Sequence, residues 1–133
     1  MQIHIAAAAI FRSDGKFLLV RKRGAERFMQ AGGKLDEGEA AHEALARELM
    51  EELVLDISKA HIRYLGQLTA PAANEEGSTV LADQFVLAIE GDVSPMAELE
   101  EVRWVSFDEA LALPLAPLLT EQVLPLLNRQ GLL

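Results

Sequence analysis

The chain has 133 residues, 50% of them hydrophobic and 25% charged, which is enough to bury one core and predicts a single domain over residues 1–133. Its formal net charge of -9 argues against binding to a nucleic-acid polymer, although a divalent cation can still bridge an acidic site to a phosphorylated small molecule. Because the chain contains no cysteine, disulfides, thiol catalysis and Cys-ligated zinc are excluded.

The amino-terminal part predicts a hairpin followed by a loop. Residues 3–11 are rich in apolar side chains, Asp14-Gly15 is a turn signal, and residues 17–20 are apolar again, so the two runs are expected to pair as a β-hairpin. Residues 24–38 hold several glycines and charges and are expected to form a loop. No Lys or Arg precedes the first apolar run, and no run approaches the length of about 20 residues that spans a bilayer, so we expect a soluble cytoplasmic protein without membrane contact.

The middle of the chain predicts one long helix. Residues 39–53 are strong helix formers without Gly or Pro, and Leu45, Leu49 and Leu53 recur every four residues, as one buried stripe requires.

The remaining segments alternate irregularly between strands and helices. Strands are expected at 62–68, 80–89 and 102–105, with turn-like residues at 70–78 and an acidic loop at 98–101. Ser106 and Glu109 have the form of a capping box for a short helix that Pro114 ends, and a last helix is expected at 117–127. This order favours a mixed α+β sandwich over a doubly wound sheet.

Three carboxylates share one face of the predicted long helix. Glu48, Glu51 and Glu52 fall within an arc of roughly 100°. A hard divalent cation would relieve their repulsion and prefers oxygen ligands, although an acidic helix face is also often simply solvated. Glu52 adjoins the leucine stripe, so its carboxylate is expected at the edge of the core, where it needs a partner.

The segment Gly33–Leu55 resembles the Nudix box, G-x5-E-x7-R-E-U-x-E-E-x-G-U, where U is aliphatic. The box residues present at the required spacing are Gly33, Glu39, Arg47, Glu48, Leu49, Glu51, Glu52 and Leu55. Val54 stands in place of the last box glycine, and Ala31 stands where many members have proline. Because glycine readily adopts positive φ at a helix end and valine resists it, we expect this helix end to be built differently. The resemblance implies the family's α/β/α sandwich around a mixed sheet.

The resemblance also implies the site. The metal ligands would be Glu48, Glu51 and Glu52 together with the main-chain carbonyl of Gly32, and the ion would be Mg²⁺, with Mn²⁺ as a substitute. Arg47, four residues before Glu51, is expected to form an ion pair that orients it, and Glu39 is expected to tie the loop to the helix.

The sequence alone leaves two questions open: which residue is the general base, and which residues contact the substrate. The general base would be Glu52 or Glu48, or else Glu98, which is alternatively an exposed loop acid. The residues that could contact substrate as phosphate ligands, or that are otherwise solvated charges, are the basic cluster Arg21, Lys22, Arg23 and Arg27 together with Lys34. Phe28 is either a base-stacking or a core residue. Asn74 and Glu75-Glu76 either read a base edge or form a turn.

The expected reaction is Mg²⁺-dependent hydrolysis of a diphosphate linkage in a small nucleotide substrate, giving monophosphate and pyrophosphate from a nucleoside triphosphate. The alternatives are an ADP-ribose or nucleotide-sugar pyrophosphatase, suggested by the position of Pro71, and a Nudix domain that senses a nucleotide without cleaving it. The family resemblance also allows a homodimer.

Overall fold

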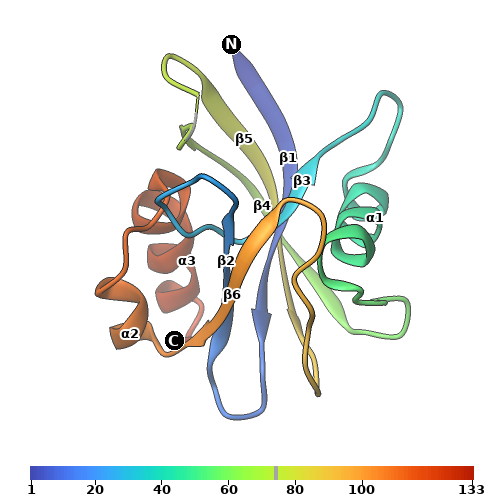
Figure 1. Cartoon of the computed structure of the whole chain (residues 1–133), viewed down its shortest axis with the longest axis vertical. Helices are drawn as coiled ribbons and strands as arrows, with labels where there is room; N and C mark the ends of the chain where they lie inside the picture. Colours follow the sequence, from blue (N-terminus) through green and yellow to red (C-terminus); the bar gives the residue numbers. More distant parts are fainter. Residues whose placement is uncertain (74) are drawn as a thin grey trace.

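The computed structural model describes residues 1–73 and 75–133. The described residues form six strands and three helical regions, which follow one another along the chain (Figure 1). The strands are β1 (Gln2–Phe11), β2 (Phe17–Lys22), β3 (Ala31–Lys34), β4 (Ile62–Pro71), β5 (Thr79–Ala88) and β6 (Leu99–Val105). The helices are α1 (Ala41–Leu53), α2 (Phe107–Leu111) and a carboxy-terminal helix formed by the π-turn η1 (Leu119–Val123) and α3 (Leu124–Arg129).

A mixed sheet runs through the molecule. Its strand order is β4-β5-β1-β2-β6, with β3 paired to β1 as a branch. β1 is parallel to β5, whereas its pairings with β2 and β3 are antiparallel. The predicted amino-terminal hairpin is confirmed, because β1 and β2 meet across a turn in which Gly15 has φ +83°.

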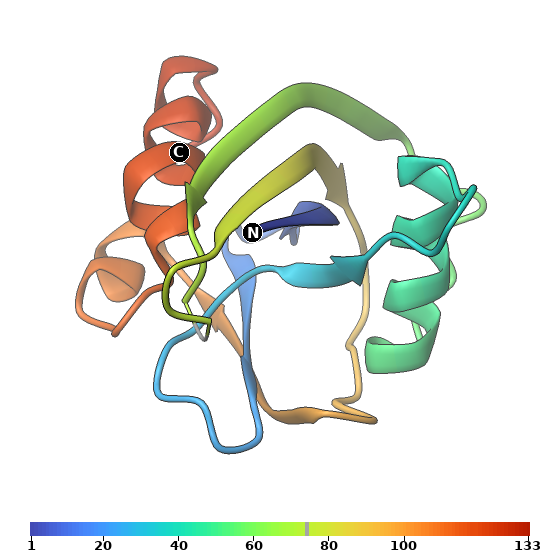
Figure 2. The same cartoon turned by 90° about the horizontal axis from the view of Figure 1, so that it is seen from above.

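Helices cover both faces of this sheet, as the two views show (Figures 1 and 2). Side chains alternate along β1, so Ala6, Ala8 and Ile10 join the core against α1, and Ala9 joins the core against η1 and α3. Coverage of both faces explains why β1 is apolar throughout. The structure confirms the predicted α+β sandwich around a mixed sheet.

Several element boundaries differ from the sequence prediction. Part of the segment expected as loop forms β3, because its backbone pairs with β1 despite the weak strand propensity of two glycines. The acidic stretch expected as loop lies mostly in β6, paired with β2. Among the described residues, no helix is long and apolar enough to cross a membrane.

The end of α1 contradicts the expectation for Val54. This residue adopts the left-handed conformation, with φ 53° and ψ 41°, that a glycine would favour. Val54 N–H donates to the Met50 carbonyl, and Leu55 N–H donates to the Leu49 carbonyl at 3.2 Å. Leu55 and the buried Ile57 pack into the core against α1, so tertiary packing offsets the strain of a β-branched residue at positive φ.

Candidate functional site

A network centred on Arg47 fixes the loop before α1 to the helix. The Arg47 guanidinium donates to the two carboxylate oxygens of Glu39 at 2.9 and 2.8 Å and to the Lys34 carbonyl at 3.0 Å. The bonds from Arg47, and then from the Asp36 backbone N–H, lower the pKa of Glu39 to about 2. Glu39 therefore stays ionised at neutral pH and holds the loop in place.

Arg47 also contacts the helix carboxylates. Its Nη1 atom lies 2.8 Å from Glu48 Oε1 and 3.6 Å from Glu51 Oε1, so the contact with Glu48 is the closer one. The Glu48 side chain is 17% exposed, whereas that of Glu51 is 55% exposed. Of the two helix carboxylates, Glu48 is therefore the closer partner of Arg47, and the expected pair with Glu51 is present as the longer contact.

The Glu48 carboxylate lies directly against β3. A Cβ atom placed on Gly33 would be 2.4 Å from the Glu48 carboxyl carbon, which is closer than atoms can approach. Only glycine at position 33 therefore leaves this space to the carboxylate. The close approach links the helix to the glycine pair of the loop.

Glu52 is a buried carboxylate without a hydrogen-bond partner for one of its oxygens. The residue is 6% exposed, and Oε1 has no partner among the described residues. Burial, and then the charge of Glu48, raise the pKa of Glu52 to about 7, while the Lys22 ammonium and the Gly32 backbone N–H act in the opposite direction. An unpartnered carboxylate oxygen at this depth is costly unless a ligand satisfies it.

The backbone of Gly32 faces the carboxylates. β3 pairs with β1 so that Gly32 lies opposite Ala7. Further along the same ladder, Leu35 N–H donates to the His4 carbonyl, so Leu35 and His4 form a hydrogen-bonded pair. Bonded pairs alternate along an antiparallel ladder, so the Gly32 N–H and C=O point away from β1. The Gly32 carbonyl is therefore left outside the β1–β3 ladder, on the side where its N–H approaches Glu52.

Lys22 and Glu98 complete this group of charges. Lys22 ends β2, and its Nζ atom lies 3.6 Å from Glu98 Oε2. The Glu98 side chain is 75% exposed, and its charge is the smallest of the influences that act on the pKa of Glu52.

These oxygens are of the kind that a hard divalent cation prefers. The charge of Glu48 acts on Glu52, and one oxygen of Glu52 lacks a partner among the described residues. The strand register leaves the Gly32 carbonyl outside the β1–β3 ladder. In the described residues, no three His, Asp or Glu side chains form a group that could hold a metal ion, and Glu48 contacts Arg47. The ligand set of Gly32, Glu48, Glu51 and Glu52 stays a prediction.

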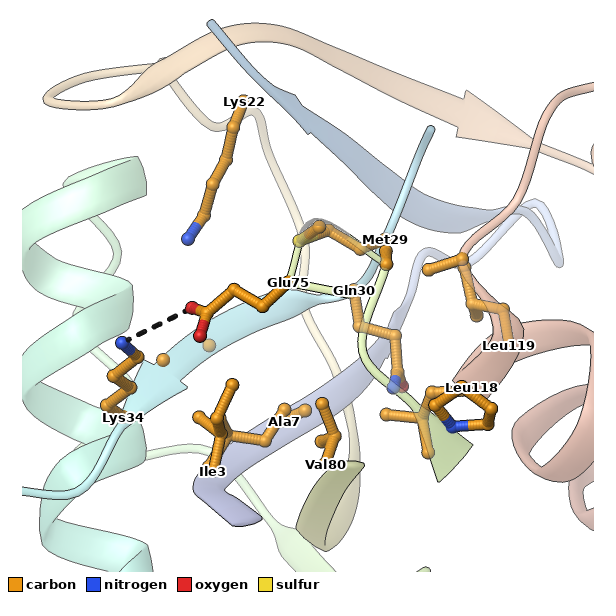
Figure 3. A pocket seen from close by; sticks show the side chains of 16 residues that line it. Ile3, Ala7, Lys22, Met29, Gln30, Lys34, Glu75, Val80, Leu118 and Leu119 are labelled. Atoms are coloured by element: carbon orange, nitrogen blue, oxygen red, sulfur yellow. Dashed lines mark ion pairs between the residues drawn. The ribbon is translucent and has the colours of Figure 1, made fainter. Parts of the chain in front are cut away.

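A cavity of about 150 Å³ opens beside the two glycines (Figure 3). Lys22 and Lys34 stand at one side, Leu118 and Leu119 at the other, and Gln30 points inward between them. The cavity and the carboxylate group share three bordering residues, Lys22, Gly32 and Gly33. A single ligand in the cavity can therefore also reach the carboxylates.

The other residues predicted to contact substrate are placed less favourably. Arg23 lies 3.4 Å from Glu100, and Arg27 donates to the Leu115 carbonyl. Phe28 is 3% exposed within the core, which fits the core interpretation and leaves no free face for a base. Of the loop residues considered as readers of a base edge, Glu75 borders the cavity, Glu76 does not, and Asn74 lies outside the described residues.

Sequence reasoning missed a buried amide pair beside this cavity. Gln30 and Gln84 bond to each other, although 54 positions separate them. The available signal was Asp83-Gln84 in the middle of an otherwise apolar strand, because polar residues there require a buried partner. Lys22 was part of a basic cluster whose members the sequence did not distinguish.

Comparisons with known proteins show the family of the chain. A family model described as NUDIX domain matches residues 2–127. A CTP pyrophosphohydrolase of Escherichia coli (strain K12) is 32% identical over 123 residues, which cover 88% of this chain and 86% of that protein.

Two solved structures illustrate the shared fold. A MutT protein from Methanosarcina mazei Go1 has a TM-score of 0.80 at 24% identity and covers 98% of this chain and 95% of its own. The NUDIX domain of Shewanella oneidensis NrtR, complexed with ADP ribose, has a TM-score of 0.78 at 18% identity and covers 98% of this chain and 88% of its own.

Proposed function

The chain belongs to the Nudix hydrolase family, and on that basis we propose that it hydrolyses a nucleoside triphosphate to the monophosphate and pyrophosphate with the help of Mg²⁺. The similar E. coli protein is a pyrophosphohydrolase of CTP, which supports a triphosphate substrate. The observation that carries the proposal is Glu52: a buried carboxylate with an unpartnered oxygen, beside Glu48, at the box position of a metal ligand.

Glu48, Glu51, Glu52 and the Gly32 carbonyl would hold the metal. When bound, a divalent ion lowers the pKa of coordinated water and neutralises charge on the phosphates. Arg47 keeps Glu48 oriented, and the bond between Arg47 and Glu39 keeps the glycine loop against the helix. The family generally uses divalent ions, and Mg²⁺, with Mn²⁺ as a substitute, is our specific proposal.

Lys22 and Lys34 are the proposed phosphate ligands. Both border the cavity, and their partners are distant, with Lys22 Nζ 3.6 Å from Glu98 and Lys34 Nζ 3.7 Å from Glu75. Long ion pairs at exposed sites contribute little, so a phosphate can displace them. Arg23 and Arg27 are weaker candidates, because neither borders the cavity.

A carboxylate must take the proton of the attacking water. Glu52 is preferred as this base or as the residue that positions the water, because it is buried beside Glu48 and next to the glycine pair. Glu98 is the alternative, since it is exposed and paired with Lys22 at the edge of the same site.

ADP-ribose is the second substrate candidate. Pro71, whose distance from the box suggested this class, borders the cavity, and the NrtR domain of similar fold is complexed with ADP ribose. Product analysis separates the two reactions: a triphosphate releases pyrophosphate, whereas ADP-ribose releases AMP and a sugar phosphate. Faster turnover of ADP-ribose than of every triphosphate would overturn the proposed substrate.

The remaining properties are proposed on general grounds. We take residues 1–133 as one Nudix domain, located in the cytoplasm, and a homodimer as its possible assembly. Size measurement in solution tests the homodimer, and fluorescent tagging tests the location.

A further inference from the structure

Two glutamine side chains form a buried amide pair at the inner end of the cavity. Gln30 is 8% exposed and Gln84 is fully buried. Gln30 Nε2 donates to Gln84 Oε1 at 3.0 Å, and Gln84 Nε2 donates back to Gln30 Oε1 at 2.6 Å. This reciprocal bonding resembles the pairing of two base edges and holds both amides in one plane.

A backbone carbonyl fixes which end of each amide is the nitrogen and which is the oxygen. Gln84 Nε2 also donates to the Phe85 carbonyl at 3.0 Å, so exchanging its nitrogen and oxygen would place two acceptors together. Gln30 is bonded to both ends of Gln84 and must keep the matching orientation. The two amides are therefore locked in a single polarity.

Gln30 retains hydrogen-bonding capacity toward the cavity. A primary amide has two N–H donors and an oxygen that accepts twice, and the pair uses one of each on Gln30. One donor and one acceptor remain on a side chain that borders the cavity, whereas both Gln84 donors are used.

The rest of the cavity suits a flat ring attached to a phosphorylated sugar. Ile3, Val80 and Leu118 give it apolar walls around the Gln30 side chain (Figure 3). Lys22 and the glycine pair lie at the side that adjoins the carboxylates. A nucleotide whose phosphates meet these groups would direct its base toward the amide pair.

We propose that Gln30 reads the hydrogen-bonding edge of the nucleobase, with Gln84 as the residue that positions it. The reciprocal pair uses the edge of the Gln30 amide that faces Gln84, so the remaining N–H and the remaining oxygen lone pair lie on opposite flanks of the amide. Because the polarity is locked, the flank that meets the base is either a donor or an acceptor. Gln30 therefore bonds well to a carbonyl or to an amino group at one position of the base, but not to both. Cytosine and uracil form such a pair of opposites, as do adenine and hypoxanthine. This inference deepens the proposed function and rests on it for the identity of the ligand.

The test measures binding of product nucleotides in chelator by calorimetry, so that it needs neither metal nor turnover. We expect the unmodified protein to discriminate at least about tenfold between CMP and UMP, or between AMP and IMP, which corresponds to about one hydrogen bond. The double variant Gln30→Leu/Gln84→Leu should reduce the discrimination to less than about twofold. Replacing both partners leaves no unpaired amide, so this variant should remain folded.

Two further variants keep the result interpretable. Gln30→Met removes only the amide that contacts the base and replaces the double variant in the test if that variant is unstable. It should lose the same discrimination. Gln130→Leu removes an exposed amide that bonds Arg63 at the far end of α3, and it should keep the discrimination of the unmodified protein.

The outcomes separate this inference from the proposed function. Equal affinities for both members of each pair in the unmodified protein, or discrimination that survives in both Gln30 variants, would overturn the role of Gln30. Discrimination without any hydrolysis would refute the proposed reaction and leave base reading intact.

Discussion

The Glu48 carboxylate occupies the space that a side chain at Gly33 would fill, with a Cβ at that position only 2.4 Å from the Glu48 carboxyl carbon. The group in the way is the flexible end of a side chain, so it can move at little cost to the fold. At Gly32, by contrast, a Cβ would meet the Ala6 carbonyl oxygen at 2.1 Å, and φ is +141°. The two adjacent glycines are thus required for different reasons.

Replacing each glycine by alanine should distinguish an effect on activity from an effect on stability. Gly33→Ala should change the free energy of unfolding by less than about 1 kcal/mol but lower turnover at least about tenfold, because Glu48 is displaced. Gly32→Ala should cost about 2 kcal/mol or more, because the backbone itself must shift. Urea unfolding and steady-state kinetics check both, and normal turnover in folded Gly33→Ala would show that the position of Glu48 is unimportant.

Removing the charge of Glu52 should lower turnover without lowering the stability of the fold. Glu52→Gln should lower turnover at least about a hundredfold, because metal binding and water activation depend on this carboxylate. Burial raises the pKa of Glu52 to about 7, so the ionised form destabilises the metal-free protein at higher pH, and a neutral amide should be as stable or more so. Kinetics and thermal unfolding at pH 8, with Glu90→Gln as an exposed control, measure both effects. Near-normal turnover would exclude α1 as the metal site.

Glu98→Gln should have a smaller effect in the same assay. The Glu98 carboxylate is exposed and pairs with Lys22, so we expect a loss of less than about tenfold if Glu52 supplies the basic function. A loss as large as that of Glu52→Gln would instead assign the base to Glu98.

The bond between Glu39 and Arg47 predicts a dependence of stability on pH. The folded-state pKa of Glu39 is lowered from 4.5 to about 2, so its contribution is fully present above the unfolded value and is lost as pH falls from about 4.5 to 2. The unmodified protein should therefore exceed Glu39→Gln in stability at pH 7, and the difference should shrink toward pH 2. Urea unfolding across this range measures it, and a difference independent of pH would contradict the assignment.

Glycine at position 54 should stabilise the protein. Val54 is 60% exposed at φ 53°, so Val54→Gly relieves backbone strain and loses little packing, and the free energy of unfolding should rise by about 1 kcal/mol. Val54→Ala keeps a Cβ and should gain less. Destabilisation by Val54→Gly would mean that packing at this residue outweighs the strain.

Local patterns predicted the parts of the fold that depend on local physics. The buried leucines of α1, the Ser106–Glu109 capping box and the amino-terminal hairpin follow from periodicity, capping and turn chemistry. The burial of Glu52 followed from its place beside the leucine stripe.

Features that depend on distant contacts were not predictable in this way. β3 contains two glycines and exists because its backbone pairs with β1, and Val54 is held at positive φ by the packing of residues after it. The contact between Gln30 and Gln84 joins a loop to the sheet centre, and no local rule indicates that partner.

The most direct test of the account is turnover of nucleoside triphosphates, CTP first, by the purified protein with Mg²⁺ and then with excess chelator. The account predicts release of pyrophosphate and nucleoside monophosphate that stops in chelator and is lost in Glu52→Gln. Tight nucleotide binding without turnover of any nucleotide at saturating Mg²⁺ would contradict it and identify a sensor domain instead.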